Sequence, residues 1–329
     1  MRRWMRSPGM SEPPDEFDWI AALRPLTRGH AAALDLKDDA AVLPARPGFD
    51  LIVSEDAMVE GVHFLEGEDA SIVARRLLRT SLSDLAAKAA EPFGYTLMSA
   101  WPARRGWDER MAFIRGLDED GARYGVALLG GDTVSTPGPL TVSATVYGWV
   151  PAGRAVLRSG ARPGHALVVC GVVGDGALGL AAARGAHPGG DALAARYRLP
   201  EPKFVLREAL LAFASASADV SDGLVADAMH LAEASGCGLR IDLAATPLSD
   251  EARAWLAGRP RDEALVELAT AGDDYALVCA SPEGGLLAQA SHAWGIPAAV
   301  IGAFTASEGL VLTVGGREVA ARRLGWRHT

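Results

Sequence analysis

The chain has 329 residues, of which 49% are hydrophobic and 22% are charged, and its formal net charge is −9 at pH 7. This length predicts about two domains with substantial hydrophobic cores, and the composition excludes a largely disordered protein. The negative charge argues against a nucleic acid or an anionic membrane surface as the main partner. Any bound anion therefore needs cations at its site.

Residues 1–15 open with a basic stretch that no apolar signal core follows, so a flexible tail is predicted, with Met10 as an alternative start. Short apolar runs at 49–56, 95–102 and 139–151 predict strands, the last one half-buried. Apolar residues recur at helical spacing over 69–91 and 111–124. These elements form the first predicted domain, residues 16–150.

Residues 150–165 are rich in Gly, Pro and Arg, and this composition predicts the boundary to a second domain, residues 151–329. Its sequence pattern predicts strands at 166–174, 238–243, 275–282, 298–304 and 309–316, and helices at 201–214 and 222–236. Strand and helix patterns alternate in both halves. We therefore expect an α/β or α+β fold throughout.

No apolar run approaches the ~20 residues that a membrane-spanning helix needs, so no membrane partner is expected. Cys170, Cys237 and Cys279 are far apart and form no C-x-x-C motif, which is typical of reduced, buried thiols. A cytoplasmic location is predicted from these features.

Several familiar site motifs are absent from the sequence. There is no H-E-x-x-H, no G-x-S-x-G, and no lysine placed as a Walker-type phosphate loop requires. "GDGALG" (174–179) fits G-x-G-x-x-G, but a dinucleotide site also needs an acid about 20 residues further on, at a strand end. The nearest acid, Asp191, opens a predicted helix. The motif is therefore interpreted as a glycine turn between a strand and a helix.

Acidic side chains recur beside apolar sequence in six short patches: "KDDAAVL" (37–43), "SEDAMVEGVHF" (54–64), "LSDLAAKAAEP" (82–92), "GGDTV" (130–134), "DVSDGL" (219–224) and "AGDDYALV" (271–278). Asp and Glu are rarely buried without a partner, and lysines are nearly absent. Carboxylate oxygens are ligands that Mg²⁺ prefers, so the patches together predict a divalent metal site. Taken singly, Asp222 is equally well explained as the N-cap of a helix beginning at Gly223, and Asp84 as an i,i+4 partner of Lys88.

The motifs "DDAAVL", "VEGVHF", "LSDLAA", "YGVALLGGDT", "LRSGARPG" and "DVSDGLVADAMHLAEASG" occur in an order and spacing that resemble the thiamine-monophosphate kinase family. That family lies within the aminoimidazole-ribonucleotide-synthetase-like superfamily, and the likeness runs from about Glu16 to Trp326. It implies a two-domain synthetase-like fold in which the N-terminal sheet pairs with that of a second copy in a dimeric β-barrel, beside a C-terminal α/β domain. It also implies ATP-dependent phosphorylation of thiamine monophosphate to thiamine diphosphate with several Mg²⁺ ions.

The resemblance implies a role for each matching position. Metal-binding positions correspond to Asp38, Ser54, Glu55, Asp56, Asp84, Asp132, Asp219 and Asp222. ATP-binding positions correspond to Gly131, Asp132, Arg158, Ser221 and Ile114. Substrate-binding positions correspond to His63, Asp273 and Trp326.

Three positions depart from the family pattern. Glu55 replaces a Thr and adds a charge beside the metal positions, Asp273 replaces a longer Glu, and Ile114 stands where an aromatic residue often packs on ATP. By residue type alone, His63 is better explained as a core histidine and Trp326 as a packing residue. The resemblance instead favours a phosphate donor and an aromatic neighbour of the cationic thiazolium.

The expected chemistry is consistent with this assignment. The nucleophile would be a phosphate oxygen, and a phosphomonoester with a second pKa near ~6 is largely ionised at neutral pH. No general base is then required, and the difficulty is repulsion between two polyanions, which bound Mg²⁺ offsets.

Other functions remain open at this point. A hydrogenase maturation factor shares the architecture but works through a C-terminal cysteine, whereas this chain ends "GWRHT". A selenophosphate synthetase is disfavoured because the N-terminal stretch has no Cys. A non-catalytic ATP-binding dimer is the remaining alternative.

Overall fold

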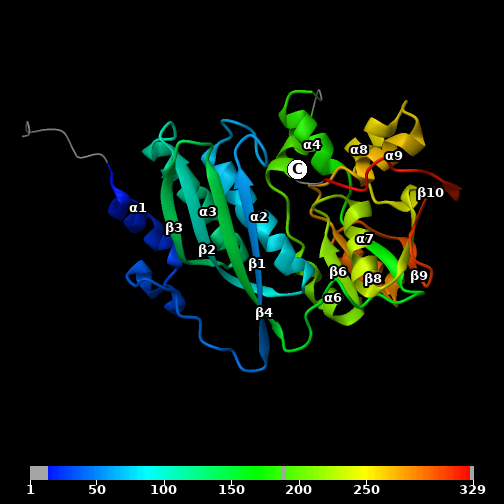
Figure 1. Ribbon diagram of the computed structural model, residues 1–329, viewed down its shortest axis with the longest axis horizontal. Coiled ribbons are helices and arrows are strands. Elements are labelled where there is room, and N and C mark those ends of the chain that lie inside the picture. The colour runs from blue at the N-terminus through cyan, green and yellow to red at the C-terminus, as the bar shows by residue number, and fades with distance from the viewer. Residues whose placement is uncertain (1–13, 187–189, 327–329) are drawn as a thin grey trace, which may run out of the picture.

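The computed structural model describes residues 14–186 and 190–326. Two units, each built on its own sheet, lie side by side along the longest axis of the molecule, the N-terminal unit in blue to green and the C-terminal unit in green to red (Figure 1). The two units are joined in two ways: residues 152–165 connect them along the chain, and α2 (Ala70–Ala87) contacts β6 (Ala216–Asp219) of the C-terminal unit. The predicted tail 1–15 lies outside the described residues up to residue 13, and Asp15 is the N-cap of the first helix.

The N-terminal unit is an open sheet of four strands in the order β1-β4-β2-β3. Its strands are β1 (Phe49–Val59), β2 (Glu91–Pro102), β3 (Ala127–Thr136) and β4 (Thr141–Pro151); its helices are α1 (Glu16–Leu23), α2 and α3 (Trp107–Tyr124), with short 3₁₀ turns at Arg24–Thr27 and Ala31–Leu36. Asp69 begins α2 by accepting from the amides of Ser71 and Ile72, and Gly125 ends α3 in the left-handed conformation.

The two faces of this sheet have different environments. Strand residues alternate between faces, so Ile52, Ser54, Asp56 and Met58 point toward the helices, and the buried apolar side chains of α2 and α3 pack there in one core. The opposite face is only partly covered in the single chain: the segment 32–43 packs with Tyr147 there, whereas Leu51, Val53 and Val134 are 39%, 52% and 46% exposed. The sheet does not close into a barrel within the described chain, so the predicted dimeric barrel stays a prediction.

The C-terminal unit has a seven-stranded sheet in the order β11-β10-β7-β9-β5-β8-β6. Its strands are β5 (Ala166–Cys170), β6 (Ala216–Asp219), β7 (Gly238–Asp242), β8 (Leu277–Ser281), β9 (Ala298–Thr305), β10 (Leu310–Val314) and β11 (Arg317–Glu318). Its α-helices are α4 (Asp175–Ala183), α5 (Asp191–Arg198), α6 (Arg207–Phe213), α7 (Leu224–Ser235), α8 (Asp250–Leu256), α9 (Arg261–Ala269) and α10 (Gly284–Ala293), with 3₁₀ turns at Phe204–Leu206 and Leu243–Ala245.

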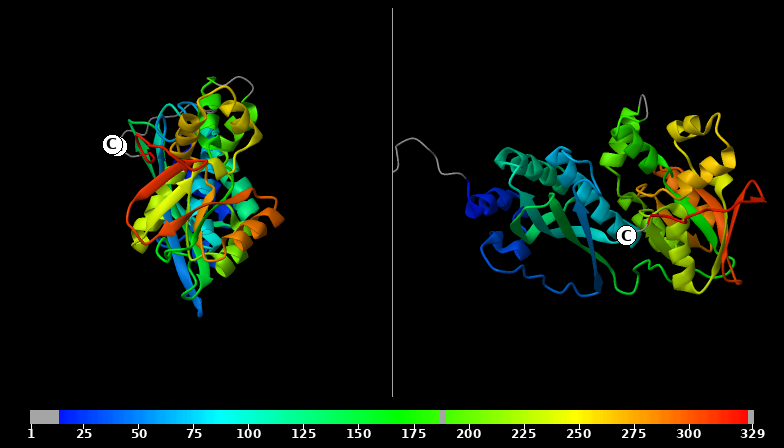
Figure 2. Two further views of the ribbon diagram at one scale, coloured as in Figure 1. Left: turned by 90° about the vertical axis from the view of Figure 1, so that its right-hand side faces the viewer. Right: turned by 45° about the horizontal axis from the view of Figure 1, so that its top comes forward.

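Both faces of this second sheet are covered (Figure 2). Leu167 and Val169 of β5 pack in one core with α7 and α9, whereas Val168 and Cys170 pack in another with α6 and α10. A strand buried on both faces is continuously apolar, which is why "ALVVC" is recognisable in the sequence.

The structure confirms a mixed α/β fold with one sheet per unit, and most predicted elements are present. Two predicted boundaries differ because glycines stop the element: β5 ends before Gly171 (φ 126), and α7 begins after Gly223 (φ 133). Gly174 (φ 92) likewise precedes α4. The interpretation of "GDGALG" as a strand-to-helix turn is therefore confirmed. The sequence analysis missed β3 and the short helices α8, α9 and α10. Within the described residues, no helix is long and apolar enough to cross a bilayer.

Candidate active site

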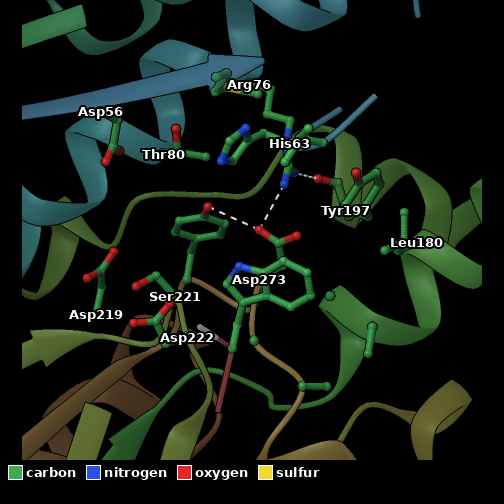
Figure 3. Close-up of a pocket in the computed structure, with 18 of the residues that line it drawn as sticks. Asp56, His63, Arg76, Thr80, Leu180, Tyr197, Asp219, Ser221, Asp222 and Asp273 are labelled. Carbon is green, nitrogen blue, oxygen red and sulfur yellow. Dashed lines mark hydrogen bonds and ion pairs between the residues drawn. The ribbon is translucent and has the colours of Figure 1, made fainter. Parts of the chain in front are cut away.

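A cavity of about 410 Å³ lies between the two units (Figure 3). The N-terminal unit contributes β1, the turn after it and α2, and the C-terminal unit contributes α4, α5, the segment after β6 and the loop before β8. Eight of the predicted site residues line it: Asp56, His63, Asp84, Asp219, Ser221, Asp222, Asp273 and Trp326. Residues distant in sequence thus meet at one place.

One end of the cavity is acidic. Strand alternation turns Asp56 toward α2, whose last turn carries Asp84, and Asp219 is the final residue of edge strand β6. Burial, together with the charge of the neighbouring Asp84 carboxylate, raises the pKa of Asp56 to about 6. Burial and Asp84 also raise the pKa of Asp219 well above its ordinary value. Repulsion within this group disfavours the fully ionised state.

The acidic end has little cationic compensation from the protein. Lys88 donates its ammonium to the Ser217 carbonyl, and burial lowers its pKa to about 8. Among the described residues it makes no ion pair with Asp84, whose Oδ2 instead accepts from Ser54 Oγ at 2.5 Å. The alternative explanation of Asp84 as a partner of Lys88 therefore lacks a direct ion pair, although the charge of Asp84 acts to raise the pKa of Lys88 against the effect of burial. Several hard oxygen donors that repel one another fit a divalent cation such as Mg²⁺.

Asp222 is not the N-cap of α7, because Gly223 occupies that position without a side-chain cap. Asp227, one turn into the helix, accepts instead from the amides of Asp222 and Gly223 at 3.1 Å each. Asp222, Asp227 and His230 offer ligand atoms within 4.8 Å of one another. Asp227 is a residue the sequence analysis missed, although its acid-rich motif was recognised.

The other end of the cavity carries aromatic and cationic groups. His63 Nδ1 accepts from the Val59 amide at 3.0 Å, so a neutral ring carries its proton on Nε2. Trp326 is 50% exposed and its amide donates to the Asp222 carbonyl at 2.8 Å. Both side chains line the cavity, which does not fit the alternatives of a buried core histidine and a purely packing tryptophan.

Three predicted residues lie in a second cavity of about 400 Å³, beside α1 and the 31–41 segment: Asp38, Gly131 and Asp132. Asp132 is in register with Met98, on the sheet face opposite to that of Asp56. Within one chain, the sheet separates these acids from the first cavity. The seven acidic residues predicted to bind metal therefore do not meet inside a single chain.

The remaining predicted residues are outside both cavities. Glu55 is exposed and accepts from Ser143 Oγ at 2.8 Å, because it points away from Asp56 on the alternating strand. Ile114 is 7% exposed and packs in the core of the N-terminal unit, which contradicts a stacking contact with ATP in this conformation. Arg158 is exposed, and its charge helps to lower the pKa of Lys88 near the acidic end.

The structure also adds residues that sequence reasoning missed: Arg76, Thr80, Tyr197, Tyr275 and Arg323. Arg76 lies in "ARRLLR", where a run of arginines indicates a solvent-exposed helix face, yet its side chain is buried at 3% exposure. The sequence signal that could have identified Arg76 is its spacing of about two helical turns from Asp84, which places both residues on the same side of one helix.

Glu60 anchors the turn that carries His63. It accepts from the amides of Gly67 and Leu140 and from Arg104 and Arg105. Burial alone would raise its pKa, but the donors, led by Arg105, outweigh burial and lower the pKa to about 2. A depressed carboxyl pKa contributes stability above the unfolded value, and this contribution is lost as pH falls through the folded value.

Glu60→Gln is therefore expected to lower the free energy of unfolding at pH 7 by roughly 2–3 kcal/mol. The difference from the wild type should shrink between pH 4.5 and about pH 2, the unfolded and folded pKa values. Urea denaturation at a series of pH values measures it. Glu109→Gln, which removes an exposed partner of Arg105, is the control and should change little. A difference that is independent of pH would contradict the role of the ionised carboxylate.

Comparison with known proteins identifies the class. Residues 37–150 match the N-terminal domain of AIR synthase related proteins, and residues 162–315 match their C-terminal domain. The chain is therefore a two-domain protein of the AIR synthase related class. It is 54% identical over 321 residues to the thiamine-monophosphate kinase of Caulobacter vibrioides, across 96% of this chain and 91% of that relative.

Solved structures agree with this likeness. The thiamine-monophosphate kinase of Stenotrophomonas maltophilia K279a matches with a TM-score of 0.80 at 32% identity, over 92% of this chain and 98% of that one. AaThiL complexed with AMPPCP and TMP matches with a TM-score of 0.76 at 26% identity, over 95% and 97%. The chain belongs to the thiamine-monophosphate kinase family, and it is an enzyme of that family.

Proposed function

We propose that this chain transfers the γ-phosphoryl group of ATP to thiamine monophosphate, giving thiamine diphosphate and ADP. The observation that carries the proposal is the cavity between the units, which is acidic at one end and aromatic and cationic at the other. The carboxylates suit a metal-bound polyphosphate, and the aromatic rings suit a heteroaromatic cation because the charge of Arg76 is neutralised by Asp273. The likeness to AaThiL complexed with AMPPCP, an ATP analogue, and TMP supports the same pair of ligands.

We propose that Asp56, Asp84, Asp219 and Asp222 hold Mg²⁺, with Ser54 orienting Asp84 through its hydrogen bond. When bound, Mg²⁺ would neutralise the phosphates and offset charge in the transition state. The raised pKa values of Asp56 and Asp219 support this assignment, because a bound divalent cation would offset both the burial and the repulsion that raise them.

The protein side chains then bind and orient the reactants for in-line transfer. His63, protonated on Nε2, is placed to donate to a phosphate oxygen, and Ser221 offers a further hydroxyl at the acidic end. No base is needed, because the attacking phosphate oxygen is already ionised at neutral pH. Catalysis in this scheme rests on positioning and charge neutralisation.

We further propose a homodimer that covers the exposed face of the N-terminal sheet. Leu51 and Val53 on edge strand β1 and Val134 on edge strand β3 are apolar side chains on that face that a single chain leaves partly exposed. Asp38, Gly131 and Asp132 lie in the cavity beside this sheet, so they would join the acids of the first cavity only across an interface between two copies. Buried thiols and this chemistry are consistent with action in the cytoplasm.

Replacing Trp326 by Leu is expected to raise the KM for thiamine monophosphate by about twofold to thirtyfold, since a ring beside a cation contributes ~0.5–2 kcal/mol. The KM for ATP should change little. Initial rates with each substrate varied in turn measure the two constants. Equal effects on both would favour packing as the role of Trp326.

The function is tested by incubating the protein with ATP, Mg²⁺ and thiamine monophosphate and separating the thiamine esters by chromatography. Thiamine diphosphate and ADP in equal amounts are expected, and neither should form when a chelator removes the metal. ADP without thiamine diphosphate would point to another acceptor, as in a hydrogenase maturation factor or a selenophosphate synthetase. ATP binding without turnover would favour a non-catalytic dimer.

A further inference from the structure

Arg76, on α2 of the N-terminal unit, reaches Asp273 of the C-terminal unit at the edge of the cavity (Figure 3). Its Nη2 donates to Asp273 Oδ1 at 2.8 Å. Its Nη1 donates to the Tyr197 carbonyl, and the guanidinium carbon lies 4.3 Å from the centre of the Tyr197 ring. A planar guanidinium fixed in this way can hold a carboxylate in one orientation.

The two oxygens of Asp273 have different environments. Oδ1 accepts from Arg76 and also from the Tyr275 hydroxyl at 3.2 Å. Within residues 14–186 and 190–326, no donor to Oδ2 is seen, and the side chain is 34% exposed at the cavity. Two protein donors thus occupy one oxygen, and the other is available to a ligand.

The backbone of this loop is fixed as well. Asp273 (φ 64) and Tyr275 (φ 49) are both in the left-handed region, which side chains other than Gly seldom adopt. The amide of Asp273 donates to the Ser221 carbonyl at 2.8 Å, and that of Tyr275 donates to the Val220 carbonyl at 2.9 Å. The segment that follows Asp219 therefore holds the backbone, while Arg76 of the other unit holds the side chain.

We propose that Arg76 is a positioning residue for substrate recognition. Together with Tyr275 it holds Oδ1 of Asp273, so that Oδ2 accepts an N–H group of thiamine monophosphate. Because Arg76 and Asp273 come from different units, the substrate contact is complete only when the two units are correctly placed. This inference rests on the proposed function and adds a residue to it.

Arg76→Met is expected to raise the KM for thiamine monophosphate about tenfold and to change the KM for ATP less than about twofold, because the lost hydrogen bond involves a charged pair at the substrate end. Arg76→Lys keeps the charge and one donor, and should recover most of the loss. Rescue by Lys distinguishes positioning of Asp273 from simple packing on Tyr197. If Arg76→Met does not fold, Arg76→Gln takes its place.

A double-mutant cycle with Asp273→Asn tests whether Arg76 acts through Asp273. Adding Arg76→Met to Asp273→Asn should change the KM by less than about twofold, since the two residues form one unit. Additive losses would show that Arg76 contacts the substrate directly and would overturn the proposal. Arg123→Gln is the control, because it removes an exposed ion pair with Glu201 outside the cavity, and wild-type constants are expected.

The experiments distinguish the proposed function from the proposed role of Arg76. A wild-type protein that makes no thiamine diphosphate contradicts the proposed function itself. Wild-type turnover together with an unchanged KM in the Arg76→Met variant contradicts only the role of Arg76.

Discussion

Replacing Asp219 or Asp56 by Asn is expected to lower turnover about 100-fold or more at saturating ATP and fixed Mg²⁺, because each variant removes a charged ligand from the proposed metal site. Asn has nearly the same shape, so the cavity should keep its form. The rate of thiamine diphosphate formation measures the loss. Near-normal rates in both variants would remove these residues from the metal site.

The same variants should unfold at an equal or higher temperature than the wild type when Mg²⁺ is absent. Burial raises the pKa of both carboxyl groups, so their ionised forms destabilise the folded chain at neutral pH. For Asp56, a pKa of about 6 in place of 3.8 corresponds to roughly 2–3 kcal/mol at pH 7. Thermal unfolding with and without Mg²⁺ then separates lost chemistry from lost folding. Asp262→Asn, a surface acid paired with Arg317, is the matched control.

Replacing Val53 by Asp is expected to give a monomer and to lower turnover about tenfold or more, because an unpaired charge would be buried in the proposed interface. Val53 is 52% exposed and stands opposite Tyr147 on the face of the N-terminal sheet that points away from α2 and α3. Its substitution leaves the core on the helix side untouched. Sedimentation equilibrium gives the mass, and turnover measured over a range of protein concentrations links activity to assembly.

Val300→Asp is the control for this variant. Val300 lies on β9 of the C-terminal unit and is 45% exposed. The change in polarity is therefore similar, but it lies away from the proposed interface on the N-terminal sheet. A Val53→Asp monomer with full turnover would show that Asp38 and Asp132 are not needed from a second chain. A wild-type protein that is monomeric at all concentrations would contradict the dimer itself.

Local patterns identified many of the elements that build the site. The short apolar run at 49–56 identified β1, and the glycines of "GDGALG" identified a turn. Strand β3 was missed because "ALLGGDTVST" places two glycines and an acid in its centre, and these residues disfavour strands when judged locally. Pairing with β2 over its whole length outweighs that preference.

Only some of the acidic residues that were predicted to share one site lie together within a single chain. Asp56, Asp84, Asp219 and Asp222 line one cavity, but Asp132 lies on the other face of the sheet. Whether a strand residue faces one side or the other depends on register, and a shift of one residue reverses it. The sequence shows which residues are acidic, whereas register and strand order decide which of them can share a ligand.

The amino-acid sequence by itself determined the composition of the site: hard carboxylate oxygens beside apolar segments, few lysines, and the family to which the motifs belong. Only the tertiary structure decided that Arg76 crosses between the units to Asp273, that Ile114 is a core residue, and that the acids divide between two cavities. The physical reason is that contacts between distant segments depend on strand order, on the face each side chain takes and on how the two units pack. None of these is encoded in a local pattern.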